Sequence, residues 1–262
     1  MNKDNKEIFE NISKALSLFS EKIISVIGTA TKVFAEKTIP YLQSLYEEIP
    51  DISPERTLEL ENFCETLLGY GWVMFDFLPI DVYQETFDSV ETANAYMEEY
   101  CTSKNIEKIF ETLSNNSHIS NEDISNIKIC FEAGAYKACC SLIMTNLEHY
   151  ILSDYDISNN ALLKQPAIQK IKELNTEMNA NKFTIFTYLH NYSLYLGLNE
   201  VFKDIKDIKN VDDTNFVIPS RHCLQHGYSK RQYTKKDSLF LLLLLFGFIE
   251  QKCYIIKEKA ED

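Results

Sequence analysis

Apolar residues recur at intervals of three and four along most of this chain, and that spacing predicts amphipathic helices. The first segment is an example, with Ile8, Ile12, Leu16 and Phe19 at helical spacing. Similar patterns, bounded by caps or breaks, predict helices over residues 6–37, 54–68, 89–101, 104–113, 120–153, 160–178, 182–204 and 234–257. The last of these is expected to open with a capping box formed by Thr234 and Asp237. The aromatic segment 70–78, YGWVMFDFL, fits either a short strand or a buried helix, and its periodicity does not decide between them.

The longest apolar run, LFLLLLLFGFI over residues 239–249, is about half as long as a membrane span. It predicts a helix that is apolar on all sides and buried in the core or at a subunit interface. The helix over 6–37 is amphipathic, but its acidic residues dilute the basic face. Packing against the rest of the protein is therefore favoured there over binding to a membrane surface, and we expect no membrane partner.

The N-terminal sequence MNKDNKEIFENISK is polar and acidic, unlike a secretory signal peptide. The 7 Cys residues form no CxxC pair, and their number is odd. Both features predict reduced thiols and a cytoplasmic protein.

Charge is distributed unevenly along the chain. Residues 1–128 hold 10 basic and 23 acidic residues, which gives 10 − 23 = −13, whereas residues 129–262 hold 16 of each. The acidic first half should repel a phosphate backbone, whereas the second half has no net charge and should not repel it. The polar stretch 114–121, SNNSHISN, lies close to the point where the charge changes and is the best linker in the chain.

These patterns predict an all-α protein of two parts. Only 7 Gly and 6 Pro occur in 262 residues, which disfavours an all-β fold rich in turns. Residues 1–115 are expected to form an acidic helical domain of unknown role. Residues 120–262 are expected to form a helical bundle that folds without the first part.

The segment 219–227, PSRHCLQHG, concentrates residues suited to chemistry. Ser220 can cap a short helix and Gly227 can end it in the left-handed conformation. Between them, Arg221 and His226 are separated by four residues, and His222 shares a helix face with His226. Five basic residues and no acidic ones occur from 219 to 236, and the four that follow the motif are Lys230, Arg231, Lys235 and Lys236.

This combination favours phosphodiester chemistry on RNA. An arginine offers a planar fork for phosphate oxygens, and a histidine moves protons near neutral pH. RNA carries its own nucleophile, the 2′-hydroxyl, so neither a metal nor a cofactor is strictly required. The chain contains no HExxH, GxxxxGK[ST] or GxGxxG motif, and we expect no metal site and no cofactor.

Residues 120–262 resemble the HEPN superfamily, whose members are small helical bundles and in many cases metal-independent RNases. The resemblance rests on the Arg-x4-His spacing of Arg221 and His226, on His222 in the polar slot after the arginine, and on the apolar helix that follows. The earlier helix around 133–152 is similar to the family's core helix, where an acidic residue such as Glu148 is common.

The resemblance implies an endoribonuclease that acts as a toxin or abortive-infection effector in antiphage defence. It further implies a homodimer whose two motifs line one cleft, with an antitoxin or trigger protein as a possible partner. Arg221 would hold the scissile phosphate, His226 would act as general base or acid, and His222 would position one of them or the substrate. Glu148 could support the Arg/His pair, and Lys230, Arg231, Lys235 and Lys236 would bind RNA.

Two alternatives stay open. The bundle could be a non-catalytic module for dimerisation or interaction, or a regulator that binds a phosphate ligand at Arg221 without cutting it. Tyr188, Tyr192 and Tyr195 recur at helical spacing and could stack on bases, but such a stripe more often belongs to a core. His149 and His190 lie in apolar helices and are expected to be core residues.

Overall fold

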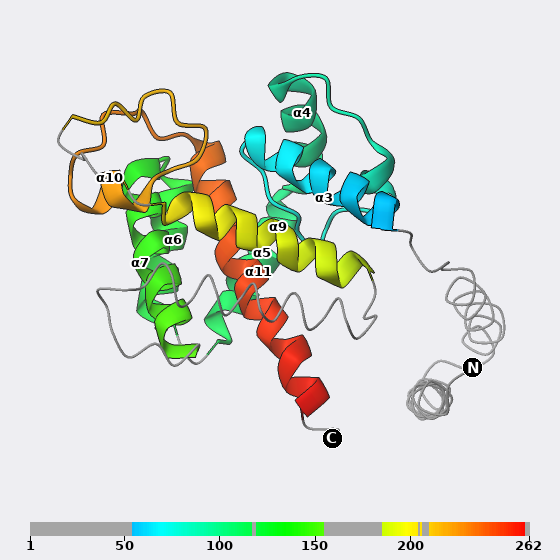
Figure 1. Cartoon of the computed structure of the whole chain (residues 1–262). Helices are drawn as coiled ribbons and strands as arrows, with labels where there is room; N and C mark the ends of the chain where they lie inside the picture. Colours follow the sequence, from blue (N-terminus) through cyan, green and yellow to red (C-terminus); the bar gives the residue numbers. More distant parts are fainter. Residues whose placement is uncertain (1–53, 117–118, 155–184, 204, 206–209, 260–262) are drawn as a thin grey trace. The chain divides into compact units, whose positions relative to one another are not determined.

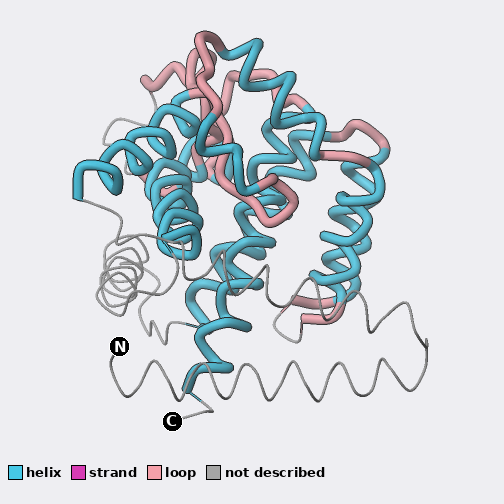
Figure 2. The backbone as a smooth tube through the Cα atoms, turned by 90° about the vertical axis from the view of Figure 1, so that its right-hand side faces the viewer, coloured by secondary structure: helices cyan, strands magenta, loops and turns pink. Residues whose placement is uncertain are grey.

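The computed structural model describes residues 54–116, 119–154, 185–203, 205 and 210–259 (Figure 1). The helices predicted over 6–37 and 160–178, and His118, lie outside the described residues. Within these ranges every regular element is a helix, which confirms the all-α prediction for them, and Figure 2 shows only helices and loops there. The elements are α3 (Pro54–Gly69), η1 (Ile80–Gln84), α4 (Val90–Tyr100), α5 (Ser103–Ser114), α6 (Asn121–Glu132), α7 (Tyr136–Asp154), α9 (Ile185–Val201), α10 (Arg221–Gln225) and α11 (Lys235–Lys259).

The aromatic segment after α3 is neither a strand nor a helix. Gly71 adopts a positive φ of 79°, and Trp72 to Phe75 then continue as irregular chain with all four side chains buried. The indole nitrogen of Trp72 donates to Asn94 Oδ1 at 2.9 Å, and the backbone N–H of Met74 donates to Ser193 Oγ at 2.9 Å. Side chains therefore satisfy both donors, one of which is a backbone N–H that a neighbouring strand would pair with in a sheet.

The single helix predicted over 120–153 is wrong, because the chain breaks at Gly134. Gly134 has a φ of 72°, its N–H donates to Phe131 O, and the N–H of Ala135 donates to Cys130 O. These two bonds and the left-handed glycine form the motif that commonly ends helices. Helix α6 thus ends at Glu132, and α7 turns back and packs against it.

Helix α11 carries the long apolar run, and the prediction that this run is buried is confirmed. Thr234 and Asp237 form the expected capping box, with the Asp237 carboxylate accepting from the N–H of Thr234 at 2.7 Å. The side chains from Leu239 to Ile249, glycine aside, are at most 4% exposed. Helices α5, α7 and α9 pack around α11, which explains why it can be apolar on all sides (Figure 1).

Two glycines permit the close crossing of α9 and α11. A Cβ atom added at Gly197 would lie 2.7 Å from a Val73 methyl carbon and 3.2 Å from one of Leu244. A Cβ atom added at Gly247 would lie 2.7 Å from the two methyl carbons of Leu194. Any larger residue would force the two helices apart or displace these neighbours.

The boundary predicted at 114–121 does not separate two cores. Helix α3 packs along α9, and α5 packs on both α6 and α11, so elements from both sides of that stretch share one hydrophobic cluster. The described residues from Pro54 onward belong to a single compact unit. The apolar faces of α3 and α5 are completed by later helices, and a polar connecting stretch does not reveal such long-range packing.

Candidate functional site

Residues 219–227, the Arg/His segment, contain the short helix α10 (Arg221–Gln225) that their sequence predicts. Ser220 caps it, with its hydroxyl oxygen accepting from the N–H of Cys223 at 3.4 Å. Gly227 follows the helix with a φ of 75°. Buried Cys223 and Leu224 anchor α10 to the protein, while Arg221 begins the helix and His226 caps its end.

Glu148 of α7 binds Arg221 through both of its carboxylate oxygens. Arg221 Nε donates to Oε2 at 3.0 Å and Nη2 donates to Oε1 at 2.6 Å. The Arg221 side chain is 21% exposed and the Glu148 side chain is 16% exposed, so the pair lies at the edge of the core. The structure thus brings together two candidate residues that are 73 positions apart, and this contact fixes the orientation of the guanidinium fork.

The two histidines of α10 lie side by side. Their ring centroids are 4.9 Å apart, and His226 is exposed. His222 is partly buried, and its Nδ1 accepts from the backbone N–H of Ile205 at 3.5 Å. That bond holds the ring of His222, whereas the ring of His226 faces solvent and is accessible for proton exchange.

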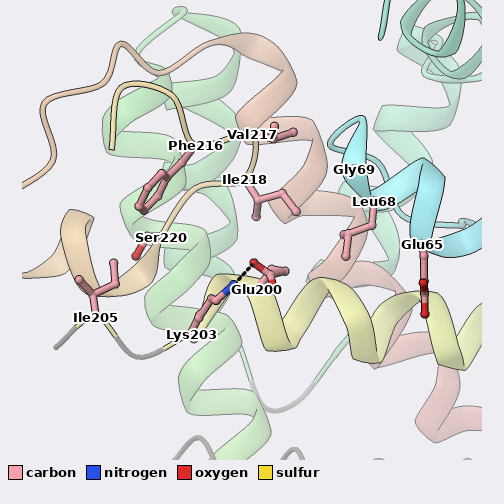
Figure 3. Close-up of a pocket in the computed structure, with 10 residues that line it drawn as sticks. All are labelled: Glu65, Leu68, Gly69, Glu200, Lys203, Ile205, Phe216, Val217, Ile218 and Ser220. Atoms are coloured by element: carbon pink, nitrogen blue, oxygen red, sulfur yellow. Dashed lines mark hydrogen bonds and ion pairs between the residues drawn. The ribbon is translucent and has the colours of Figure 1, made fainter. Parts of the chain in front are cut away.

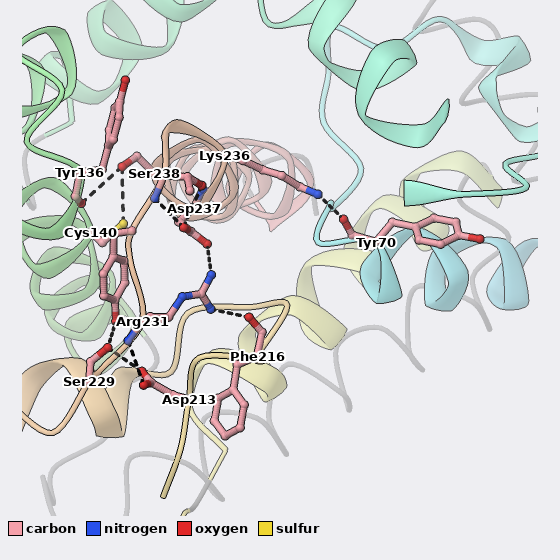
Figure 4. Close-up of polar contacts among 12 residues, drawn as sticks. Tyr70, Tyr136, Cys140, Asp213, Phe216, Ser229, Arg231, Lys236, Asp237 and Ser238 are labelled. Atoms are coloured by element: carbon pink, nitrogen blue, oxygen red, sulfur yellow. Dashed lines mark hydrogen bonds and ion pairs between the residues drawn. The ribbon is translucent and has the colours of Figure 1, made fainter. Parts of the chain in front are cut away.

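Two of the four basic residues expected to bind RNA are committed to contacts inside the protein. The Arg231 side chain is only 9% exposed; it pairs with Asp237, and its Nη1 donates to Phe216 O at 2.7 Å (Figure 4). Lys236 donates to the carbonyl of Tyr70 and lies over the Trp72 ring, and burial lowers the pKa of its ammonium group. Both cations therefore stabilise the fold, and these internal contacts argue against the prediction that they bind RNA.

The remaining two cations, Lys230 and Lys235, are exposed and keep the role of candidate RNA contacts. Sequence reasoning missed the residue that organises the loop before them. Asp213 is fully buried and accepts from the backbone N–H of Lys230 at 2.7 Å, from that of Arg231 at 3.2 Å, and from Ser229 Oγ (Figure 4). In the sequence this aspartate lies in a charged connection and carries no signal that distinguishes it from its neighbour Asp212.

A pocket of about 550 Å³ lies next to α10 (Figure 3). Its wall comes from the end of α3, the end of α9, Ile205, the segment 216–218 and Ser220. Two of these residues touch the Arg/His segment, because Ser220 caps α10 and the N–H of Ile205 contacts His222. No sequence motif predicts this pocket, since its wall is assembled from separate segments.

Two of the tyrosines and one of the two remaining histidines contact neighbouring elements of the fold, whereas the other histidine is exposed. Tyr188 donates to Glu61, and Tyr192 donates to Glu65 at 2.8 Å, so this part of the tyrosine stripe fastens α9 to α3. His190 Nδ1 lies 3.4 Å from Asp76 Oδ1, and burial lowers the pKa of this histidine. His149 is exposed on α7, contrary to the expectation of a core position, because it points away from the neighbouring helices.

Among the described residues, no three His, Cys, Asp or Glu side chains gather so as to hold a metal ion, and the cysteines form no disulfide. None of the helices described is both long and apolar enough to cross a membrane. No protein-family model, no curated protein and no solved structure matches this chain.

Proposed function

We propose that this chain is a metal-independent endoribonuclease of the HEPN type. The observation that carries the proposal is the arrangement on α10, where an oriented Arg221 begins a short surface helix and a solvent-accessible His226 ends it. An arginine fork can stabilise the charge that develops during cleavage by the 2′-hydroxyl, and an imidazole can transfer a proton. The absence of a family match leaves the resemblance of the motif and the geometry of these residues as the grounds for the proposal.

Arg221 has the donors that a phosphate would need. A guanidinium group carries five N–H donors, and Glu148 uses two bonds, one from Nε and one from Nη2. The remaining donors can bind the non-bridging phosphate oxygens while Glu148 keeps the fork in place. In this scheme Glu148 is a positioning residue, and Arg221 stabilises the negative charge that develops on the non-bridging oxygens.

The reaction is attack by the 2′-oxygen on the adjacent phosphorus, with cleavage of the bond to the 5′-oxygen. His226 acts as general base on the 2′-hydroxyl proton or as general acid toward the leaving 5′-oxygen, and water accepts or supplies the other proton. His222, whose ring is 4.9 Å from that of His226 and is held by the Ile205 N–H, positions His226 or the substrate. The products are a 2′,3′-cyclic phosphate and a 5′-hydroxyl.

The proposal includes the setting that the HEPN resemblance implies. The protein would act in the cytoplasm as a toxin or abortive-infection effector, under the control of an antitoxin or trigger protein. It would form a homodimer through the C-terminal bundle, and exposed Lys230 and Lys235 would add contacts to the RNA backbone.

The test is RNA cleavage by the full chain in the presence of EDTA, with analysis of the product ends. His226→Ala should lower the cleavage rate by about 10² to 10⁴, the usual contribution of one acid–base group. Arg221→Ala should fall in a similar range, and Arg221→Lys should not restore activity, because a point charge does not replace a fork. His149→Ala is the matched control, since that histidine is exposed but lies outside α10.

A strict requirement for Mg²⁺, products with 5′-phosphate ends, or full activity of His226→Ala would refute the mechanism. If no RNA is cut, a second candidate function gains. The pocket beside Ser220 favours a regulator that binds a small ligand, with a phosphate of that ligand at Arg221, over a purely structural interaction module, because a scaffold needs no such cavity.

A further inference from the structure

The pocket beside α10 has the size and the mixed lining of a small-ligand site. Its volume of about 550 Å³ lies within the usual range for such sites. Leu68, Val217 and Ile218 supply apolar surface (Figure 3). Three charged residues also line the pocket: Glu200 and Lys203, and Glu65, whose carboxylate accepts from Tyr192. An apolar slot with a few convergent polar groups is suited to a flat heteroaromatic ring that has a polar edge.

The polar groups form a donor–acceptor pair at the end of α9. Lys203 Nζ lies 3.3 and 3.2 Å from the two carboxylate oxygens of Glu200. The lysine side chain is 65% exposed and the glutamate side chain 35% exposed, so the pair contributes little to stability. A ligand can separate the two groups at little cost and then face an ammonium donor beside a two-oxygen acceptor.

Guanine matches this pair better than the other RNA bases. Its Watson–Crick edge presents the O6 acceptor next to the N1–H and N2–H donors, so O6 can accept from Lys203 while both donors bind the Glu200 carboxylate. Adenine, cytosine and uracil each offer only one donor on that edge, and each makes at most two of these bonds. One additional net hydrogen bond corresponds to roughly two- to tenfold in affinity.

Phe216 provides a stacking surface whose backbone is held in place. The residue is 36% exposed, and its carbonyl oxygen accepts from Nη1 of the buried Arg231 at 2.7 Å. A partly exposed aromatic ring in the wall of a pocket is a common platform for a base that has left its stack. The contact with the buried Arg231 therefore holds the backbone of Phe216 in place (Figure 4).

We propose that this pocket binds a guanine base of the RNA substrate and so selects the cleavage site, an inference that rests on the proposed ribonuclease function. The pocket adjoins the motif at two points: Ser220 lies in its wall and immediately precedes Arg221, and Ile205 lies in its wall and bonds His222. A base seated here therefore places its own backbone next to the catalytic groups. A free guanine nucleotide would present the same edge, and the experiment separates the two sources.

The first arm measures binding of GMP, AMP, CMP and UMP to the full chain by calorimetry or NMR, which requires no cleavage. GMP should bind roughly two- to tenfold more tightly than the others. Glu200→Gln should abolish this preference, whereas Glu99→Gln, at an exposed glutamate of α4, should retain it. Phe216→Ala should weaken the binding of all four nucleotides and keep the order of their affinities. Ile129→Ala, at an exposed position on α6, should leave all four affinities unchanged.

The second arm maps cleavage of RNAs that differ only in the position of a single G. If the position of cleavage moves with the position of the G for the wild type but not for Glu200→Gln, the result would support a guanine base of the RNA substrate as the ligand of the pocket. Binding of GMP without cleavage of any RNA would refute the ribonuclease proposal and assign the pocket to a free guanine nucleotide. Cleavage without any preference for G, together with equal binding of all four nucleotides, would overturn the guanine pocket and leave the ribonuclease proposal standing.

Discussion

The ion pair between Arg221 and Glu148 should contribute measurably to stability, and the structure permits an estimate. Its two charge-assisted hydrogen bonds span 3.0 and 2.6 Å, and the side chains are 21% and 16% exposed. Hydrogen bonds to charged groups contribute about 1.5–3 kcal/mol, and removal of one partner from a fully buried pair costs about 3–5 kcal/mol. For this partly buried pair we expect each single alanine substitution to cost about 2 kcal/mol.

The assay is a double-mutant cycle in urea, with Arg221→Ala, Glu148→Ala and the double variant. We expect a coupling energy of about 1–2 kcal/mol, because the double variant leaves no charge without its partner. The pair of Arg56 and Glu59 on α3 is the matched control: its N–O distance is 2.7 Å, but its side chains are 50% and 64% exposed. Its coupling should stay below about 0.5 kcal/mol.

A coupling for Arg221 and Glu148 no larger than that of the control would refute this reasoning. The result also bears on the activity test. The position of the motif at a helix end near the surface suggests that Arg221→Ala leaves the fold intact, but the contact with Glu148 means that this variant loses stability as well as charge. Cleavage by Arg221→Ala should therefore be measured at a temperature at which the variant is shown to be folded.

Three further predictions concern the fold. Gly197→Ala should destabilise the protein by about 1–3 kcal/mol, because the new Cβ atom would lie 2.7 Å from the stiff side chain of Val73. Thermal unfolding measures this loss. Gly69→Ala is the control: its Cβ atom would meet no atom within 4 Å, and the substitution should leave stability unchanged. A fragment of residues 120–262 should fail to unfold cooperatively, since α3 and α5 complete its core; a sharp transition would contradict that packing. Burial holds the pKa of His190 below its ordinary value of 6.5, so at low pH the unfolded chain takes up a proton that the folded protein excludes. The free energy of unfolding should therefore fall as the pH drops below about 6.5. In His190→Asn it should fall less steeply.

The sequence alone determined the elements whose causes are local. Within the described residues, most of the helices predicted from periodicity, the Ser220 cap, the glycine after α10 and the capping box of Thr234 depend on residues close together in the chain, and the structure confirms them. Burial of 239–249 also follows from composition, because eleven residues of this kind neither span a bilayer nor face water. The break at Gly134 was equally local, but the apolar stripe on either side of it concealed the signal of that glycine.

Only the tertiary structure decided which polar residues are free to act. Arg231 and Lys236 look like exposed cations in the sequence, yet Asp237 and the carbonyl of Tyr70 bind them, and Tyr70 is 166 residues from Lys236. The pairing of Glu148 with Arg221 and the pocket beside Ser220 likewise join segments far apart in the chain. The physical reason is that such contacts depend on how whole helices pack, and helix packing is set by long-range burial that the periodicity of one segment does not encode.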